Sequence, residues 1–211
     1  HFRPVSHYFR QNFSQVTNPP IDSLRENKVM SLKTRFGNLG NILDFDNLTE
    51  ENIYVLDSPI LTNMQFKKFK KFFSKKVKVI DCTFNIEESL KERIELIREE
   101  AETAVREGST CLILSDKNIS NQKASIPSIL TVGAVHSHLV KHGLRGYCSL
   151  NVECSDAMDT HSFAILIGVG ATTVNPYLAI DSIYQRFEKK LFGKSDFESC
   201  VSKFKKSIDA G

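Results

Sequence analysis

The stretch that decides the fold is residues 110–116, TCLILSD, a continuous apolar run of strand length. A run without polar alternation is typical of a strand covered on both faces, as in a parallel sheet. Three more strand-like segments lie before and after it in the chain: VKVIDC (77–82), GYCSLNVE (146–153) and ATTVNP (171–176). Helical patterns separate them, so the sequence predicts an α/β fold with a parallel sheet and right-handed crossovers.

The helices are indicated by apolar spacing and by the residues at their ends. Ser125 is expected to cap a helix that has Pro127 in its first turn, because proline has no N–H to leave unpaired there. Ser155 or Asp156 is expected to cap the next helix, although its apolar run alone also fits a strand. Thr62 or Asn63 is expected to start the helix MQFKKFKKFF (64–73), and Ser195 or Asp196 to cap the last helix. The other expected helices cover 86–108, 128–143, 156–168 and 177–192, and the last covers 195–211.

The N-terminal part looks different, an irregular helical segment rather than a regular alternation. VTNPPID (16–22) must stop any helix that precedes it, because each proline pushes the preceding residue into an extended conformation. Asp22 can then cap a helix over 23–32, with Arg25 in its first turn. Residues 36–50 are rich in Gly, Asn and Asp and predict a loop. We therefore expect a linker with helices over 1–50 and an α/β domain over 51–211.

Composition and charge exclude several classes of protein. The chain has 211 residues, 41% of them hydrophobic and 25% charged, which fits one domain or two small ones. A net charge of +3 gives no support for a nucleic-acid partner. The lysines of 67–76 therefore fit the solvated face of an amphipathic helix better than a phosphate patch. The longest apolar stretches are too short to cross a bilayer, so no membrane partner is expected.

The five cysteines indicate a reduced, cytoplasmic protein. Their number is odd and they form no CxxC pair, so neither a zinc ribbon nor an iron–sulfur motif is encoded. Several lie in apolar runs, where a thiol behaves as a small hydrophobic side chain. They are Cys82, Cys111, Cys148, Cys154 and Cys200.

Candidate ligand-binding residues lie where the predicted strands end. In parallel α/β folds, ligands bind at the carboxyl ends of the strands. Asp116, Lys117, Glu153 and Asn175 occupy such positions, and the first three could line a pocket for a polar ligand. Strand ends are usually polar whatever their function, so a free-standing enzyme acting on a small anionic metabolite is kept as the alternative.

The histidines and the glycines carry weaker signals. His138 and His142 are four residues apart and could share a zinc ion on one helix face, but no third ligand is apparent locally. A cation near the end of that helix would also be favoured by the helix dipole.

His161 is expected to be a core or interface histidine. Gly168-Val-Gly170 precedes a strand, the reverse of the order that a dinucleotide fingerprint needs.

Five stretches resemble one family, the central domain of the large subunit of glutamine-dependent glutamate synthase. The resemblance extends over nearly all of residues 6–185, and VTNPPID followed by LRE is its most specific part. The stretches are QVTNPPIDSLRE (15–26), DSPILTN (57–63), LILSDKNIS (112–120), ASIPSILTVGAVHSHLVKHGLR (124–145) and GVGATTVNPYLAID (168–181).

This resemblance implies a connector within a large enzyme that converts glutamine and 2-oxoglutarate to two glutamates. An amidotransferase domain with an N-terminal cysteine would precede it, and a flavin-binding barrel with FMN and an iron–sulfur cluster would follow. The central domain is then an α/β unit similar to part of that (βα) barrel. It would bind no cofactor or metal, carry no catalytic residue and be inactive alone. Those two domains are the implied partners, together with a small NADPH-dependent subunit where that is the electron donor.

The resemblance also implies that the domain helps to form an ammonia passage. We expect Thr17 and Asn18, held by Pro19 and Pro20, to line or border it, with Asp22 and Arg25 at the same interdomain position. The other interpretation is that these residues form only a rigid elbow.

The sequence departs from the family at 153–156, which reads Glu-Cys-Ser-Asp. His161 is followed by Ser162 instead of a second histidine, and the family's GYGA reads GVGA. Both changes favour a structural role there.

Overall fold

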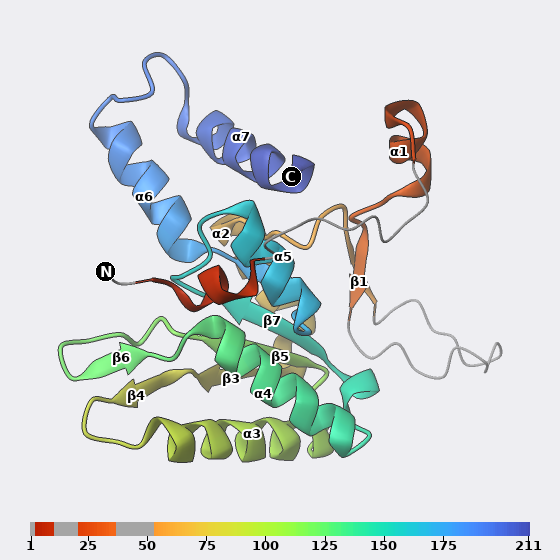
Figure 1. The fold of residues 1–211 in the computed structure, drawn as a ribbon, viewed down its shortest axis with the longest axis vertical. Coiled ribbons are helices and arrows are strands. Elements are labelled where there is room, and N and C mark those ends of the chain that lie inside the picture. The colour runs from red at the N-terminus through yellow and green to blue at the C-terminus, as the bar shows by residue number, and fades with distance from the viewer. Residues whose placement is uncertain (1–2, 11–20, 37–52) are drawn as a thin grey trace.

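The centre of the molecule is a four-stranded parallel sheet in the order β3-β5-β7-β8 (Figure 1). The computed structural model describes residues 3–10, 21–36 and 53–211. The strands are β3 (Val77–Asp81), β5 (Cys111–Ser115), β7 (Ser149–Glu153) and β8 (Thr173–Asn175). Each strand lies beside the next one in the chain, the arrangement of successive units in a (βα) barrel. The predicted parallel α/β fold is confirmed.

Helices connect the strands and then extend the chain beyond them. α3 (Leu90–Arg106), α4 (Ser128–Lys141) and α5 (Thr160–Gly168) are the three crossovers. α6 (Tyr177–Glu188) follows β8 and packs on α7 (Phe197–Ala210). Within the described residues, no helix is long and apolar enough to span a lipid bilayer.

The two faces of the sheet are covered by different parts of the chain. Leu112 and Leu150 point toward the crossover helices and join the larger buried core with residues of α3, α4 and α5. Cys111 and Ile113 point the other way, into a smaller cluster with α2 (Asn63–Phe73). Figure 1 shows the crossover helices on the near side of the sheet and α2 behind it. The face that would line the inside of a closed barrel is therefore filled by α2.

The packing of α2 follows from its sequence. Phe66, Phe69 and Phe73 recur at helical spacing and are all buried. Thr62 caps the helix, as expected, by accepting from the N–H of Gln65, whose side chain in turn accepts from the N–H of Thr62 at 3.0 Å. This reciprocal pair satisfies two backbone donors and fixes where the helix begins.

The N-terminal part carries short elements. η1 (Val5–Phe9) packs on α5, and β1 (Thr34–Phe36) pairs antiparallel with β2 (Tyr54–Leu56). α1 (Ser23–Val29) is capped by Asp22, as expected, but ends before residue 32, where we predicted its end. In Figure 1, α1 stands apart from the α/β body, and the exposed fraction of the Leu24 side chain next to its cap is 83%.

One predicted helix start and one predicted helix cap are wrong because distant residues intervene. β4 (Thr83–Asn85) pairs with β6 (Lys123–Ser125) across some forty residues, and Ser89 caps α3, so α3 begins at Leu90 rather than near 86. Ser125 lies in β6 and does not cap α4. The first N–H group of α4, on Ser128, donates instead to Asp156 at 2.9 Å.

The start of α5 is also later than predicted. Neither Ser155 nor Asp156 caps it, because both side chains bond to other elements. Asp159 is the cap, and its Oδ1 accepts from the N–H of Ser162 at 2.9 Å. Of the two caps proposed for α7, Asp196 is the one observed.

One arginine joins four segments at the amino edge of the sheet. Arg145, in η4 (Arg145–Tyr147), donates to the carbonyls of Cys148 at 2.6 Å and Gly170 at 2.9 Å. It also donates to His136 Nδ1 at 3.2 Å and to the Thr172 hydroxyl at 3.3 Å. These bonds fix the start of β7 against α4 and against the turn before β8.

Candidate functional site

The carboxyl ends of β5 and β7 bring together three of the predicted site residues. Glu153 ends β7 with a side chain only 6% exposed, and its Oε2 accepts from the Ser115 hydroxyl at 2.7 Å. Lys117 Nζ lies 3.3 Å from Glu153 Oε1, and the backbone N–H of Asp116 donates to the Glu153 carbonyl. We call Ser115, Asp116, Lys117 and Glu153 the strand-end cluster.

A lysine from α2 completes the surroundings of Glu153. Lys70 Nζ lies 3.7 Å from Glu153 Oε2 and 4.6 Å from the centre of the Phe66 ring. The sequence pattern predicts that Lys70 belongs to the solvated basic face of this helix. A signal was available, because Lys70 is four residues from Phe66 and therefore lies on the apolar side of the helix. Two lysines thus compensate one buried carboxylate.

Asp116 is the most deeply buried acid of the cluster, with an exposed fraction of 2%. Its Oδ2 accepts from the N–H of Ser155 at 3.0 Å and from the Ser155 hydroxyl at 2.6 Å, whereas Oδ1 is buried without a hydrogen bond to any described residue. Burial raises the pKa of Asp116, and the bonds from Ser155 oppose that shift. The pKa of the neighbouring Tyr177 is also raised, first by burial and then by Asp116.

Asn175 lies at the same edge of the sheet, but its side chain bonds to the segment before α2. Its side-chain amide donates to the Leu61 carbonyl at 2.9 Å and to Asn63 Oδ1 at 3.0 Å. Beside it, the 59–61 segment bonds along β8, with Leu61 N–H donating to the Val174 carbonyl. Asn175 therefore fixes the loop that leads into α2 and does not join the strand-end cluster.

Each of the two buried acids binds one serine hydroxyl. Asp116 accepts a hydrogen bond from Ser155, and Glu153 accepts one from Ser115. Burial raises the pKa of the nearby Cys82 thiol to about 12, which keeps it protonated at neutral pH. The cluster is suited to holding strand ends together.

The expected channel residues are only partly described. Thr17, Asn18, Pro19 and Pro20 lie outside the described residues. Asp22 accepts from the N–H groups of Leu24 and Arg25, both at 3.0 Å, and its other oxygen lies 3.4 Å from Arg25 Nε. The interaction of Asp22 with Arg25 is therefore local to the first turn of α1.

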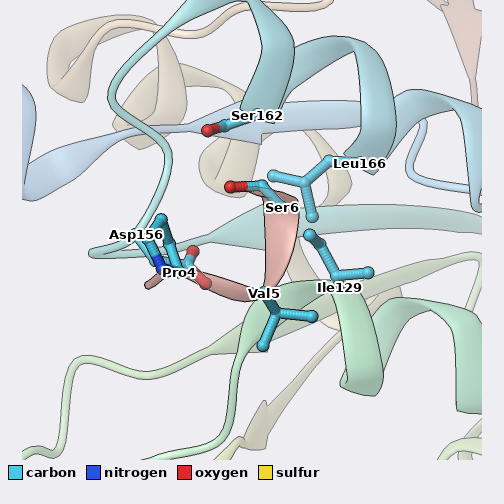
Figure 2. A pocket seen from close by; sticks show the side chains of 7 residues that line it. All are labelled: Pro4, Val5, Ser6, Ile129, Asp156, Ser162 and Leu166. Atoms are coloured by element: carbon cyan, nitrogen blue, oxygen red, sulfur yellow. The ribbon is translucent and has the colours of Figure 1, made fainter. Parts of the chain in front are cut away.

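A small cavity lies between η1 and the helices α4 and α5, and sequence reasoning did not find it. Figure 2 shows Ser6 and Ser162 near each other on one side of it and Val5 near Ile129 on the other. Its volume of about 20 Å³ suits one water-sized molecule. Next to it, His161 Nε2 lies 2.9 Å from the Ser6 carbonyl, in agreement with the interface histidine that we expected. The cavity is lined by Pro4, Val5, Ser6, Ile129, Asp156, Ser162 and Leu166.

Comparison with known proteins gives one consistent result. A family model described as the glutamate synthase central domain matches residues 1–211. The large chain of NADPH glutamate synthase from Azospirillum brasilense is 50% identical over 100% of this chain and 14% of its own length. The corresponding chain from Bacillus subtilis is 40% identical over 97% of this chain and 13% of its own length.

The name of a third relative gives ferredoxin in place of NADPH. The ferredoxin-dependent glutamate synthase of Pyropia yezoensis is 38% identical over 97% of this chain and 14% of its own length. The chain thus spans about one seventh of the relatives that it matches. Among solved structures, a flavocytochrome b2 variant with sulfite bound is 17% identical with a TM-score of 0.41, over 71% of this chain and 34% of that one.

Proposed function

This chain belongs to the glutamate synthase central domain family, and from that premise we propose that it is a non-catalytic connector inside a glutamate synthase. In this proposal the whole polypeptide converts glutamine and 2-oxoglutarate to two glutamates. An amidotransferase domain precedes the connector and a flavin-binding domain follows it. The connector positions the two and helps to enclose the path of ammonia between them.

The extent of the family match supports a connecting role most directly. The family model covers residues 1–211, whereas this chain spans 14% of the length of its Azospirillum brasilense relative. Most of such a polypeptide would therefore lie outside this domain and be joined to it. Within the domain, Ser6 contacts His161 and a Cβ on Gly211 would lie 2.9 Å from the hydroxyl of Thr160, so η1 and the residue after α7 both lie against the first turn of α5.

The strand ends support the absence of a reaction centre here. In barrels that bind phosphorylated cofactors, the phosphate lies at strand ends against N–H groups and positive charge. In this chain the buried side chains of Asp116 and Glu153 occupy the ends of β5 and β7. The two lysines at this edge, Lys70 and Lys117, are engaged by Glu153 and are therefore not free for a phosphate. Because α2 also fills the opposite face of the sheet, these residues do not fit a flavin, and we propose that FMN and the iron–sulfur cluster belong to the following domain.

An ammonia passage has a physical reason in such an enzyme. Ammonia is protonated in bulk water, and ammonium is a poor nucleophile, so a sheltered route keeps the reactive form. We assign Thr17 and Asn18 to its wall, because small neutral side chains that form hydrogen bonds suit this purpose. Pro19 and Pro20 would hold them in an extended turn. The alternative is that these residues only form an elbow.

The exposed apolar side chains of the N-terminal part agree with docking on a neighbouring domain. Leu24 and Met30 are 83% and 53% exposed, and a neighbouring domain in contact with them would cover this apolar surface. We further propose that the protein acts in the cytoplasm. A small NADPH-dependent subunit is a partner only if the electrons come from NADPH, and the described residues hold no determinant of that choice.

One experiment separates the connector from a free-standing enzyme. The purified chain is titrated with FMN and screened by thermal shift with small anionic metabolites. We expect no bound flavin and no shift. Stoichiometric flavin would contradict the assignment of the cofactor to another domain, and a shift of several degrees with one metabolite would favour the enzyme.

A second experiment tests the passage in the full polypeptide. Thr17→Val and Asn18→Leu keep the approximate volume of each side chain and remove its hydrogen bonds. We expect more glutamine hydrolysed per glutamate formed, with glutamine hydrolysis itself preserved. Lys33→Gln, an exposed change in the same part of the chain, is the matched control. If Thr17→Val and Asn18→Leu, like the control, leave the ratio of glutamine hydrolysed to glutamate formed unchanged, residues 17–20 form only an elbow. That result would refute the ammonia passage at this position but not the connecting role of the domain.

A further inference from the structure

Three potential metal ligands meet where α3 and α4 lie side by side. The ligand atoms of Glu102, His138 and His142 all lie within 4.8 Å of one another. Glu102 is in α3 and the histidines are in the last turn of α4 and just after it, so the third ligand comes from a different helix than the two histidines. Glu102 is therefore the third potential ligand beside His138 and His142, and it could not be found from the local spacing of the histidines.

The atoms are oriented for ligation. His138 Nε2 lies 2.6 Å from Glu102 Oε2, and the centres of the two imidazole rings are 4.3 Å apart. His142 Nδ1 lies 3.8 Å from Glu102 Oε2 and 2.8 Å from the His138 carbonyl, so ligation through Nδ1 would exchange that backbone hydrogen bond for a bond to the metal.

The surroundings allow a cation to enter. The side chains of His142 and Glu102 are 35% and 21% exposed, whereas that of His138 is 11% exposed. Arg106 bonds to Glu102 Oε1 at 2.8 Å and so holds the carboxylate in place while Oε2 faces the histidines. His138 Nδ1 is buried without a partner among the described residues, so Nε2 is the polar contact of that ring.

We propose that Glu102, His138 and His142 bind one divalent ion of the zinc class, which links α3 to α4. Two imidazoles and one carboxylate are a common zinc ligand set, and water would fill the remaining position. A metal inserted at this position would replace two hydrogen bonds, the one between His138 and Glu102 and the one from His142 Nδ1 to the His138 carbonyl. The site lies at the amino edge of the sheet, away from the strand-end cluster, and does not depend on the connector role.

The test uses the untagged 211-residue chain and Zn²⁺ alone, measured by titration calorimetry. Glu102→Gln and His142→Gln change partly exposed side chains and keep their approximate size. His7→Gln, a histidine in η1, is the matched control. We expect one Zn²⁺ per chain, bound at least about tenfold more weakly by the two ligand variants and unchanged in the control. Circular dichroism and Tm without metal show that each variant is folded.

Cobalt gives a second measurement. Co²⁺ in the unaltered chain is expected to show visible bands of nitrogen and oxygen ligation without the charge-transfer band of a cobalt–thiolate bond. One-to-one binding that disappears with Glu102→Gln and with His142→Gln supports the proposal. Absent binding, equal affinity in all the variants or a thiolate band overturns it, the last because it would assign the metal to cysteines.

Discussion

The substitution Gly170→Ala should destabilise the fold sharply, although it adds one methyl group. Gly170 has φ +120°, a backbone conformation that side chains disfavour. A Cβ at this position would lie 2.4 Å from His136 Cγ and Nδ1, a distance at which the ring must move. That ring accepts the hydrogen bond from Arg145 Nε, and the Gly170 carbonyl accepts from the same guanidinium.

The magnitude follows from two contributions. Holding alanine at such a φ costs roughly 1–3 kcal/mol. Displacing His136 removes the bond from Arg145, worth about 1 kcal/mol. Burial, followed by the charge of Arg145, lowers the pKa of His136, so the ring is neutral and can accept that bond. We therefore expect a loss of about 2–4 kcal/mol in the free energy of unfolding.

Urea denaturation followed by circular dichroism measures this loss. Gly168→Ala is the matched control, because Gly168 is in the last turn of α5 and its added Cβ meets no atom within 4 Å. Alanine in a helix should stabilise by roughly 0.5–1 kcal/mol relative to glycine. Each variant adds one methyl group, and the two positions are two residues apart. The two changes should nevertheless shift the free energy of unfolding in opposite directions. A loss below about 0.5 kcal/mol at Gly170 would refute the reasoning.

Three further predictions concern titratable groups. Asp159→Ala removes the cap of α5 and should lower the free energy of unfolding by about 1 kcal/mol at pH 7, measured by urea denaturation. Hydrogen bonds from Ser162 lower the pKa of Asp159 in the folded chain, so the cap contributes to stability only while Asp159 is ionised. The difference between the variant and the unaltered chain should therefore disappear as the pH falls below about 4. Burial raises the pKa of Asp116 in the folded chain above its pKa in the unfolded chain, so the unaltered protein loses stability as the pH rises between these two pKa values. Asp116→Asn should therefore flatten the dependence of the free energy of unfolding on pH. An unchanged slope would contradict this. A thiol reagent at pH 7.5 should modify Cys82 and Cys111 only after unfolding, because burial raises the pKa of both to about 12, and rapid reaction of the native chain would count against it.

The sheet was predictable because its signals are local. CLILS forms a strand that is buried at every position, as its unbroken apolar run predicted. Thr62 caps α2 because a threonine three residues before Gln65 is itself a helix-start signal. The position of Asp116 and Glu153 at strand ends followed from the same alternation, since a parallel sheet fixes where polar residues after a strand must lie, whereas their burial was not predicted.

What could not be predicted depends on pairs that are distant in the chain. Ser125 is followed by a helix and looks like a cap, but it pairs with Thr83 in a second small sheet. Asp156 supplies the acceptor for Ser128 from 28 residues away, and Glu102 approaches His138 across 36 residues. Such contacts are decided by how the layers pack, which no local spacing of residue types reports.

The shared contact surface at the start of α5 has a mechanical consequence. Ser6 of η1 contacts His161, and Gly211, after α7, lies against Thr160. Segments from opposite parts of the chain are therefore held by one helical turn. If that turn unwound, η1 and the end of α7 would be released together, while the hydrogen-bonded ladders between β3, β5, β7 and β8 would stay intact.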